Sequence, residues 1–205
     1  MTIQELTEQA FEKMKVTGVR GVLPALRAAN DGAREDVLNT NASSVYQWLP
    51  RFIEVVEPKQ IVELGGAMGV GDIMMLNSSY QDFILYSITM PEGGLEFSYV
   101  VDKYLNFVPV VGNDLDLSSW PKDLDLSKID LWYFDSDHTE KQLRAELDLY
   151  SPFFKKGAIV LFDDIHLNEE MERVWEDIKN GKYGLTDCFD ATHLLHWSGF
   201  GCCKV

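Results

Sequence analysis

The stretch Ile61-Val-Glu-Leu-Gly-Gly-Ala-Met-Gly-Val-Gly71 decides the fold of this chain. Its apolar start predicts a short buried strand, and its glycines predict a tight turn that leads into a helix at Ile73. Glycines let the backbone turn sharply and approach a ligand where a side chain would collide. The stretch therefore indicates a strand, a turn and a helix start that can hold a small polar molecule.

Strand-like and helix-like segments alternate from this stretch to the end of the chain. Such alternation predicts parallel strands with helices on both faces and a ligand site beyond the carboxyl ends of the strands. The expected strands are 60–64, 83–88, 107–111, 129–134, 158–162, 185–190 and 195–204, and the expected helices are 70–78, 95–105, 138–150 and 169–180. We therefore predict an α/β fold over residues 43–205, with a doubly wound, mostly parallel, seven-stranded Rossmann-like sheet.

Residues 1–42 are expected to form an N-terminal helical extension or lid. Thr2 and Glu5 have the spacing of a capping box, and apolar residues follow them at helical spacing. A further helix is predicted from Ser44 onward, with a kink or a restart at Pro50. The segment between the two helices has mixed signals and receives no secondary structure.

Composition limits the class of protein and its partners. A chain of 205 residues is long enough for one sizeable core, and a formal net charge of -15 disfavours nucleic acid as the substrate. The chain has no apolar run long enough to span a membrane and no signal-peptide pattern, so we expect no membrane segment and a cytoplasmic location. Cys188, Cys202 and Cys203 lack metal-ligand spacing, and we expect thiols rather than disulfides.

The spacing Glu63-Leu-Gly65-x-x-x-Gly69 resembles the first motif of class I S-adenosylmethionine-dependent methyltransferases, most closely the catechol O-methyltransferase-like group. This resemblance implies that S-adenosylmethionine is the cofactor. It places Gly65, Gly66 and Gly69 against the methionine part of the cofactor, with Glu63 in the same motif. The glycine turn and its strand would then form one end of the cofactor site.

The same resemblance implies contacts from the second and third strands. The family usually has an acid at the end of the second strand that binds the ribose hydroxyls, but this chain has Thr89 there and Glu92 three residues further on. The segment that ends in Asn113 and Asp114 resembles the family segment near the adenine. One of these two residues is expected to contact the base, although a polar turn at the strand end would explain them equally well.

Carboxylates follow the fourth and fifth expected strands, in Phe134-Asp-Ser-Asp-His138 and in Phe162-Asp-Asp164. Neighbouring parallel strands would bring these ends together, where converging carboxylates repel one another unless a proton or a cation bridges them. Oxygen ligands of this kind suit magnesium, calcium or manganese. The sequence therefore indicates a divalent metal at this edge of the sheet.

Both segments resemble the metal-binding motifs of metal-dependent O-methyltransferases, including the macrolide sugar O-methyltransferase-like and cephalosporin-hydroxylase-like proteins. The resemblance implies that Asp135, Asp163 and Asp164 bind the metal, expected to be magnesium, and that His138 is the general base. Asp137 instead has the spacing of a helix capping box with the glutamate three residues later. The resulting hypothesis is an enzyme that methylates a hydroxyl group of a small-molecule substrate.

Two other function classes stay open. A nicotinamide-dependent oxidoreductase could use the same glycine turn, but it would leave the aspartates unexplained. A non-catalytic S-adenosylmethionine-binding protein of the same fold is the stronger alternative, because Thr89 replaces the expected acid. His166, His193 and His196 have no pattern that assigns them a role, and the sequence leaves the methyl acceptor and a homo-oligomer open.

Overall fold

A computed structural model describes residues 1–17, 43–66, 69–90 and 104–205 of the chain. Residues 18–42 of the predicted extension or lid, Glu92 and most of the predicted helix 95–105 lie outside these residues. Within the described residues, each helix is too short or too polar to span a membrane.

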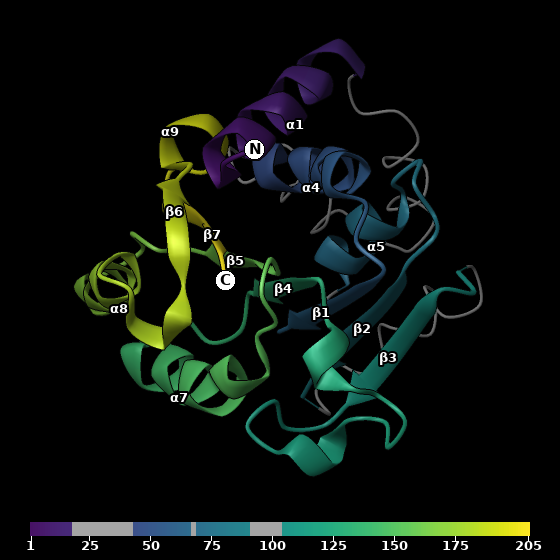
Figure 1. The fold of residues 1–205 in the computed structure, drawn as a ribbon, viewed down its shortest axis with the longest axis vertical. Coiled ribbons are helices and arrows are strands. Elements are labelled where there is room, and N and C mark those ends of the chain that lie inside the picture. The colour runs from purple at the N-terminus through teal and green to yellow at the C-terminus, as the bar shows by residue number, and fades with distance from the viewer. Residues whose placement is uncertain (18–42, 67–68, 91–103) are drawn as a thin grey trace, which may run out of the picture.

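The centre of the fold is a sheet with the strand order β3-β2-β1-β4-β5-β7-β6 (Figure 1). Neighbouring strands run parallel from β3 to β5, whereas β7 is antiparallel to both β5 and β6. The strands are β1 (Gln60–Leu64), β2 (Ile84–Thr89), β3 (Phe107–Val111), β4 (Leu131–Phe134), β5 (Ile159–Asp163), β6 (Thr186–Asp190) and β7 (Phe200–Lys204). The prediction of a mostly parallel, seven-stranded, Rossmann-like sheet is confirmed.

Helices cover both faces of this sheet. Figure 1 shows α1, α4 and α5 on one side and α7 and α8 on the other. The α-helices of the described residues are α1 (Ile3–Thr17), α4 (Ser43–Val56), α5 (Val70–Leu76), α7 (Glu140–Tyr150), α8 (Glu169–Lys179) and α9 (Thr192–Leu195), and the 3-10 helices are η2 (Leu117–Ser119), η3 (Leu126–Lys128), η4 (Ser151–Phe153) and η5 (Lys182–Gly184).

Two apolar layers hold the helices to the sheet. Successive side chains of a strand point to opposite faces, so Leu131 and Tyr133 of β4 belong to the layer under α1, α4 and α5. Trp132 and Phe134 belong to the layer under α7 and α8. All four side chains are buried, which explains why this strand has a continuous apolar sequence.

The first helix is part of the core rather than a detached extension. Thr2 and Glu5 form the predicted reciprocal cap, in which the Glu5 N–H donates to Thr2 Oγ1 at 3.2 Å and the Thr2 N–H donates to Glu5 Oε2 at 2.8 Å. Ile3, Leu6 and Ala10 are buried in the same layer as α4. The domain boundary at residue 42 stays a prediction.

The predicted strand 195–204 is wrong in its first half. Residues 192–195 form α9, whose first N–H, from Thr192, donates to Asp190 Oδ1 at 3.0 Å, and β7 starts only at Phe200. Between them Gly199 has a φ of +107°, and a Cβ there would lie 2.6 Å from the backbone nitrogen of His166. This contact with the loop after β5 requires a tight turn where apolar residues suggested a strand.

The expectation of free thiols is also wrong for two of the three cysteines. Cys188 of β6 and Cys203 of β7 form a disulfide, with their Cα atoms 4.2 Å apart. Cys202 is free and buried. Antiparallel pairing of β6 with β7 brings residues that are 15 positions apart next to each other, and spacing along the sequence does not show this.

Candidate functional site

The glycine turn after β1 is closed by contacts within the protein. The N–H groups of Gly65 and Gly66 both donate to the carbonyl oxygen of Ile88, at 3.0 and 3.1 Å. Gly65 has a φ of +97°, and a Cβ there would lie 2.0 Å from the carbonyl oxygen of Asp135. Gly69 has a φ of +70° and starts α5. At Gly65, therefore, glycine is required first by the approach of the β4 end and not by a ligand.

A cavity of about 530 Å³ opens at the carboxyl ends of β1, β2, β3 and β4. Its volume lies within the range of small-molecule sites. The residues predicted from the sequence that line it are Gly65, Thr89, Asn113, Asp114 and Asp135. Its wall also contains Asp137, which was predicted to be a helix cap, and six residues that no sequence pattern identified: Ile88, Met90, Gly112, Leu115, Ser136 and Gln142.

The segment after β3 forms the polar wall of this cavity. Asn113 Oδ1 accepts the N–H of Leu115 at 2.9 Å, so its oxygen takes part in a local turn. Asp114 Oδ1 accepts a hydrogen bond from Gln142 Nε2 at 3.0 Å, and the Tyr150 hydroxyl donates to the Asp114 carbonyl oxygen. Two residues of helix α7 thus hold Asp114 in place, Gln142 through the Asp114 side chain and Tyr150 through the Asp114 backbone.

Glu63 lies beneath the glycine turn rather than in the wall of the cavity. Its side chain is buried and accepts the Ser87 hydroxyl at 3.1 Å. Burial, followed by the neighbouring charge of Asp72, raises the pKa of Glu63 well above its usual range, and burial raises the pKa of Asp72 to about 6. Burial thus favours the uncharged form of both carboxyl groups. Contact between Glu63 and the cofactor stays a prediction.

The structure brings the three predicted metal ligands together at the ends of β4 and β5. Ligand atoms of Asp135, His138 and Asp163 lie within 4.8 Å of one another, and so do those of Asp163, Asp164 and His196. We call Asp135, Asp163 and Asp164 the aspartate cluster. His138 bridges this cluster, with Nε2 at 3.4 Å from Asp135 Oδ1 and Nδ1 at 3.3 Å from Asp164 Oδ2.

Burial and neighbouring charges shift the pKa values of these groups in different directions. Burial and the charges of Asp135 and Asp164 hold the pKa of Asp163 well above its usual range. Although burial opposes it, hydrogen bonds from His196 and Ser198 and the nearby His138 hold the pKa of Asp164 below its usual value. The two aspartates raise the pKa of His138 in turn, against the effect of burial. In this arrangement, protons and imidazoles compensate the aspartate charges.

His196 and Ser198 reach the aspartate cluster from the turn before β7. His196 Nδ1 lies 3.3 Å from Asp164 Oδ1, and the Ser198 hydroxyl donates to the same oxygen. The N–H of His166 donates to the Ser198 carbonyl oxygen at 2.7 Å, which fastens this turn to the loop after β5. Asp164 itself has a φ of +56°, an uncommon conformation for a residue with a side chain. No sequence signal pointed to these contacts, because the fold alone creates them.

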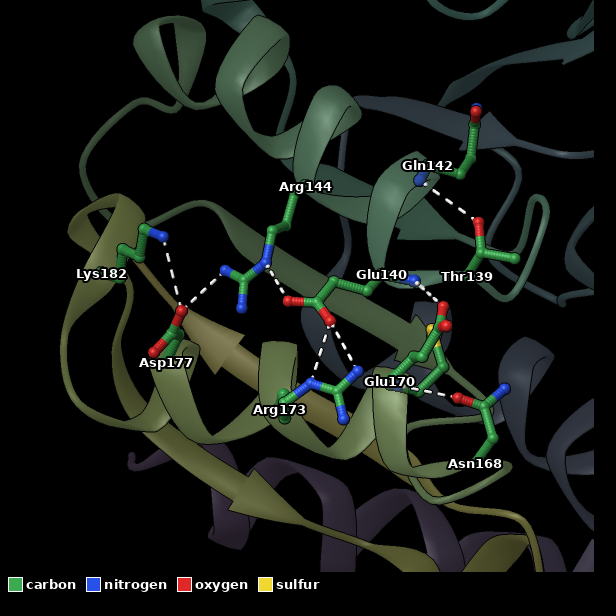
Figure 2. Close-up of polar contacts among 10 residues, drawn as sticks. Thr139, Glu140, Gln142, Arg144, Asn168, Glu170, Arg173, Asp177 and Lys182 are labelled. Atoms are coloured by element: carbon green, nitrogen blue, oxygen red, sulfur yellow. Dashed lines mark hydrogen bonds and ion pairs between the residues drawn. The ribbon is translucent and has the colours of Figure 1, made fainter.

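Asp137 does not cap the following helix. Thr139 is the N-cap of α7, where its hydroxyl accepts the N–H of Gln142 at 3.3 Å (Figure 2). The predicted Asp137 capping box is therefore wrong, since the helix starts two residues later than expected. His138 consequently lies in the loop between β4 and α7, which lets its ring turn toward Asp135 and Asp164.

The donor set of the aspartate cluster fits a divalent cation. Its three carboxyl groups supply oxygen ligands, which suit metals such as magnesium, calcium and manganese. Asp163 Oδ1 is buried and has no hydrogen-bond partner among the described residues. A buried polar atom without a partner costs free energy, and a bound cation would satisfy it.

A family model described as a methyltransferase domain matches residues 62–165. No curated protein matches the chain in sequence. Cofactor-bound Rv0187 from MTB is 17% identical with a TM-score of 0.65, and the match covers 89% of each chain. The O-methyltransferase TomG from Streptomyces achromogenes, solved with SAM, is 18% identical with a TM-score of 0.63, covering 88% of this chain and 89% of TomG. At these identities the structural matches establish the fold.

Proposed function

Because the chain belongs to the methyltransferase-domain family and has the fold of class I methyltransferases, we propose that it transfers a methyl group from S-adenosylmethionine to a hydroxyl group of a small molecule. The observation that carries the proposal is the place of Asp135. This residue lines the cavity and also belongs to the aspartate cluster. A methyl donor in the cavity and a hydroxyl group at the aspartate cluster would therefore lie next to each other at Asp135.

The cavity walls support the assignment of the cofactor. The methionine part is assigned to the glycine turn, and the base to the wall of Asn113 and Asp114. Thr89 lies at the end of β2, where its hydroxyl is a single polar group in place of the usual acid. Ribose binding through Thr89 and Glu92 remains part of the proposal. The family match favours this cofactor over a nicotinamide.

Asp135, Asp163 and Asp164 would hold a divalent cation, proposed to be Mg²⁺. Such a cation, when bound, stabilises the oxyanion form of the acceptor hydroxyl. The buried Asp163 Oδ1 without a partner supports this assignment. Ser198 and His196 orient the Asp164 carboxylate through Oδ1, leaving Oδ2 directed to His138.

His138 is proposed to take the hydroxyl proton at Nε2. Asp164 contacts the opposite ring nitrogen and fixes the orientation of the imidazole. The raised pKa makes His138 a stronger proton acceptor, and the ring must be deprotonated before the reaction. Holding the hydroxyl oxygen and the methyl donor at near-attack distance contributes about 7–11 kcal/mol to lowering the barrier.

Calorimetry with S-adenosylhomocysteine, followed by methyl transfer to hydroxylated acceptors, tests the proposal. Gly69→Val is expected to abolish binding, because it places a side chain at the turn. Gly157→Val is the matched control, since Gly157 also has a positive φ, +84°, but no atom lies within 4 Å of its Cβ position. Unchanged binding in Gly69→Val contradicts the placement, and binding without turnover on any acceptor favours the non-catalytic alternative.

We further propose a cytoplasmic location and a substrate other than nucleic acid. The formal net charge of -15 supports the second of these, because a negative surface repels phosphate backbones. Salt-dependent binding to RNA or DNA would contradict it.

A further inference from the structure

We propose that Gln142, held in place by Glu146, reads the base of the bound nucleoside cofactor and selects an amino group at the 6-position of the purine. The inference rests on the proposed function, because it concerns the cavity assigned to S-adenosylmethionine. It goes beyond that function by naming two residues of α7 that set cofactor specificity. Gln142 would contact the base, and Glu146 would act through Gln142 as a positioning residue.

Gln142 lines the cavity from the first turn of α7. Figure 2 shows its side chain extending away from the ion pairs between α7 and α8. The side-chain nitrogen Nε2 lies 3.0 Å from Asp114 Oδ1 and 3.0 Å from Glu146 Oε1. An amide nitrogen has two hydrogens, and both are engaged by these carboxyl groups. The carbonyl oxygen Oε1 is the polar atom of Gln142 that remains for a ligand.

Glu146 determines this orientation of the amide. Glu146 lies one helical turn after Gln142 and is 0% exposed. Its Oε1 also accepts a hydrogen bond from the Ser136 hydroxyl at 2.5 Å. Burial raises the pKa of Glu146 to about 8, which favours the uncharged form of the side chain beside Asp114. In the reverse orientation, the amide carbonyl oxygen would face Asp114 Oδ1 and Glu146 Oε1, the two oxygens that accept hydrogen bonds from Nε2 here. Glu146 thereby fixes Gln142 and Ser136, which both line the cavity, without lining it itself.

The wall formed by Gln142 and Asp114 consequently presents acceptors to the base. Adenine has an amino group at position 6, which donates hydrogen bonds, whereas hypoxanthine has a carbonyl oxygen there. Acceptors that face this oxygen would stay unpaired on both sides, and sites built on polar contacts reject analogues of this kind. The structure thus favours an adenosine cofactor over its deaminated, inosine-type analogue.

Titration calorimetry with two probes tests this selection in the full chain. S-adenosylhomocysteine and S-inosylhomocysteine differ at position 6, where a carbonyl oxygen replaces the amino group, and at the neighbouring N1, which carries a hydrogen only in the inosine compound. The wild-type protein is expected to bind the inosine compound about tenfold more weakly or worse, from the loss of paired acceptors. The ratio of the two affinities is the measured quantity, because a general disturbance of the cavity would weaken both ligands alike.

Four variants separate the two roles. Gln142→Met removes the acceptor, so the two affinities are expected to become nearly equal. Glu146→Gln stays uncharged and still accepts from Gln142, so the wild-type ratio is expected. Glu146→Met frees the amide to reverse, so the inosine compound should gain relative affinity. Lys141→Met, at an exposed position of the same helical turn, is the control and should keep the wild-type ratio.

The outcomes distinguish this inference from the proposed function. Equal affinities in the wild type, or an unchanged ratio in Gln142→Met, overturn the selection by Gln142 while the binding of S-adenosylhomocysteine leaves the proposed function standing. A wild-type ratio in folded Glu146→Met overturns the positioning role of Glu146. Should that variant not fold, loss of the ratio in Glu146→Gln overturns the same role. A wild type that binds neither compound overturns the proposed function and the inference together.

Discussion

The protein contains two groups of buried carboxyls close to the glycine turn, and they differ in what compensates their charge. Glu63 and Asp72 lie under the turn and are 1% and 0% exposed, and burial raises both of their pKa values, with the neighbouring Asp72 adding to the effect at Glu63. The aspartate cluster at the strand ends is instead flanked by His138 and His196.

This difference separates a structural pair from a binding site. The pair beneath the turn is enclosed by the fold, and the raised pKa values favour the uncharged form of its carboxyl groups. The aspartate cluster meets the cavity through Asp135 and has a buried oxygen, Asp163 Oδ1, without a partner among the described residues. Both carboxyl oxygens of Asp72 are likewise buried without a hydrogen-bond partner among the described residues. Access to the cavity, more than an unsatisfied oxygen or the number of acids, therefore identifies the site.

The largest expected effect is on turnover. Asp135→Ala and Asp163→Ala should each lower metal-dependent methyl transfer at least about a hundredfold, because stabilising the acceptor oxyanion is worth several kcal/mol. S-adenosylhomocysteine affinity should stay close to that of the wild type. Asp72→Asn, which changes the enclosed pair, is the control that should retain turnover. Metal binding that survives in both alanine variants, or activity indifferent to a chelator, would remove the distinction between the two groups.

His138→Ala should lower turnover about a hundredfold, the lower end of the range for general-base catalysis. Metal binding, followed by thermal shift, should persist, because the aspartates remain. His193→Ala offers a control on an exposed histidine that lies away from the aspartate cluster. Equal losses in both variants would mean that His138 has no specific role in proton transfer.

Gly65→Ala tests the close contact between the glycine turn and the backbone of Asp135 at the end of β4. Its new Cβ would lie 2.0 Å from the Asp135 carbonyl oxygen in a backbone with a φ of +97°. We expect about 3 kcal/mol of lost stability, measured by chemical denaturation. Gly157→Ala has the same kind of backbone strain without a neighbour, and we expect about 1 kcal/mol there. Similar losses at both positions would show that the clash is relieved by movement.

The enclosed pair predicts a dependence of stability on pH. The folded pKa of Asp72 is raised from 3.8 to about 6, so the folded state retains a proton that the unfolded chain has released. The free energy of unfolding should therefore fall by up to about 1.4 kcal/mol per pH unit as the pH rises through this window. Asp72→Asn should reduce this slope in denaturation curves recorded between pH 4 and pH 6. An identical slope in the variant would contradict a raised pKa of Asp72 in the folded state.

The smallest effect on stability is expected at a partly exposed carboxyl group, that of Glu140. Glu140 of α7 pairs with Arg144 at 2.8 Å and with Arg173 of α8 at 2.8 Å (Figure 2). Its ion pairs lie at the protein surface, so we expect Glu140→Ala to cause the smallest loss of stability among these variants. The cost should shrink in high salt, which screens surface charges. A large loss of stability that does not depend on salt would contradict the view that these ion pairs act as weak, solvent-screened surface contacts between α7 and α8.

Local patterns predicted most of the architecture. Strand β1 with its glycine turn and helix α8 with its cap at Asn168 were predictable, because apolar periodicity and capping depend on residues close in sequence. The same reasoning failed at 195–199 and at Asp137. In both places a neighbouring segment, rather than local preference, determines the backbone.

The candidate site shows the same division. The positions of Asp135 and Asp163 after neighbouring strands follow from the order of strands, and Thr89 stands at the end of β2 as the sequence indicated. The roles of Glu146 and Gln142 were not visible, since a glutamate on a helix usually faces solvent. The packing of α7 in the tertiary structure buries Glu146, where it contacts Ser136 and Gln142.

The amino-acid order alone determined that this chain forms a parallel sheet whose strand ends carry glycines and aspartates, because strand and helix periods and tight turns are local properties. Tertiary structure decided which acids are enclosed and which are accessible. It also brought Ser198 to Asp164 across 34 residues of sequence and paired Cys188 with Cys203. Contacts of this kind depend on how distant segments pack, and no spacing along the chain encodes them.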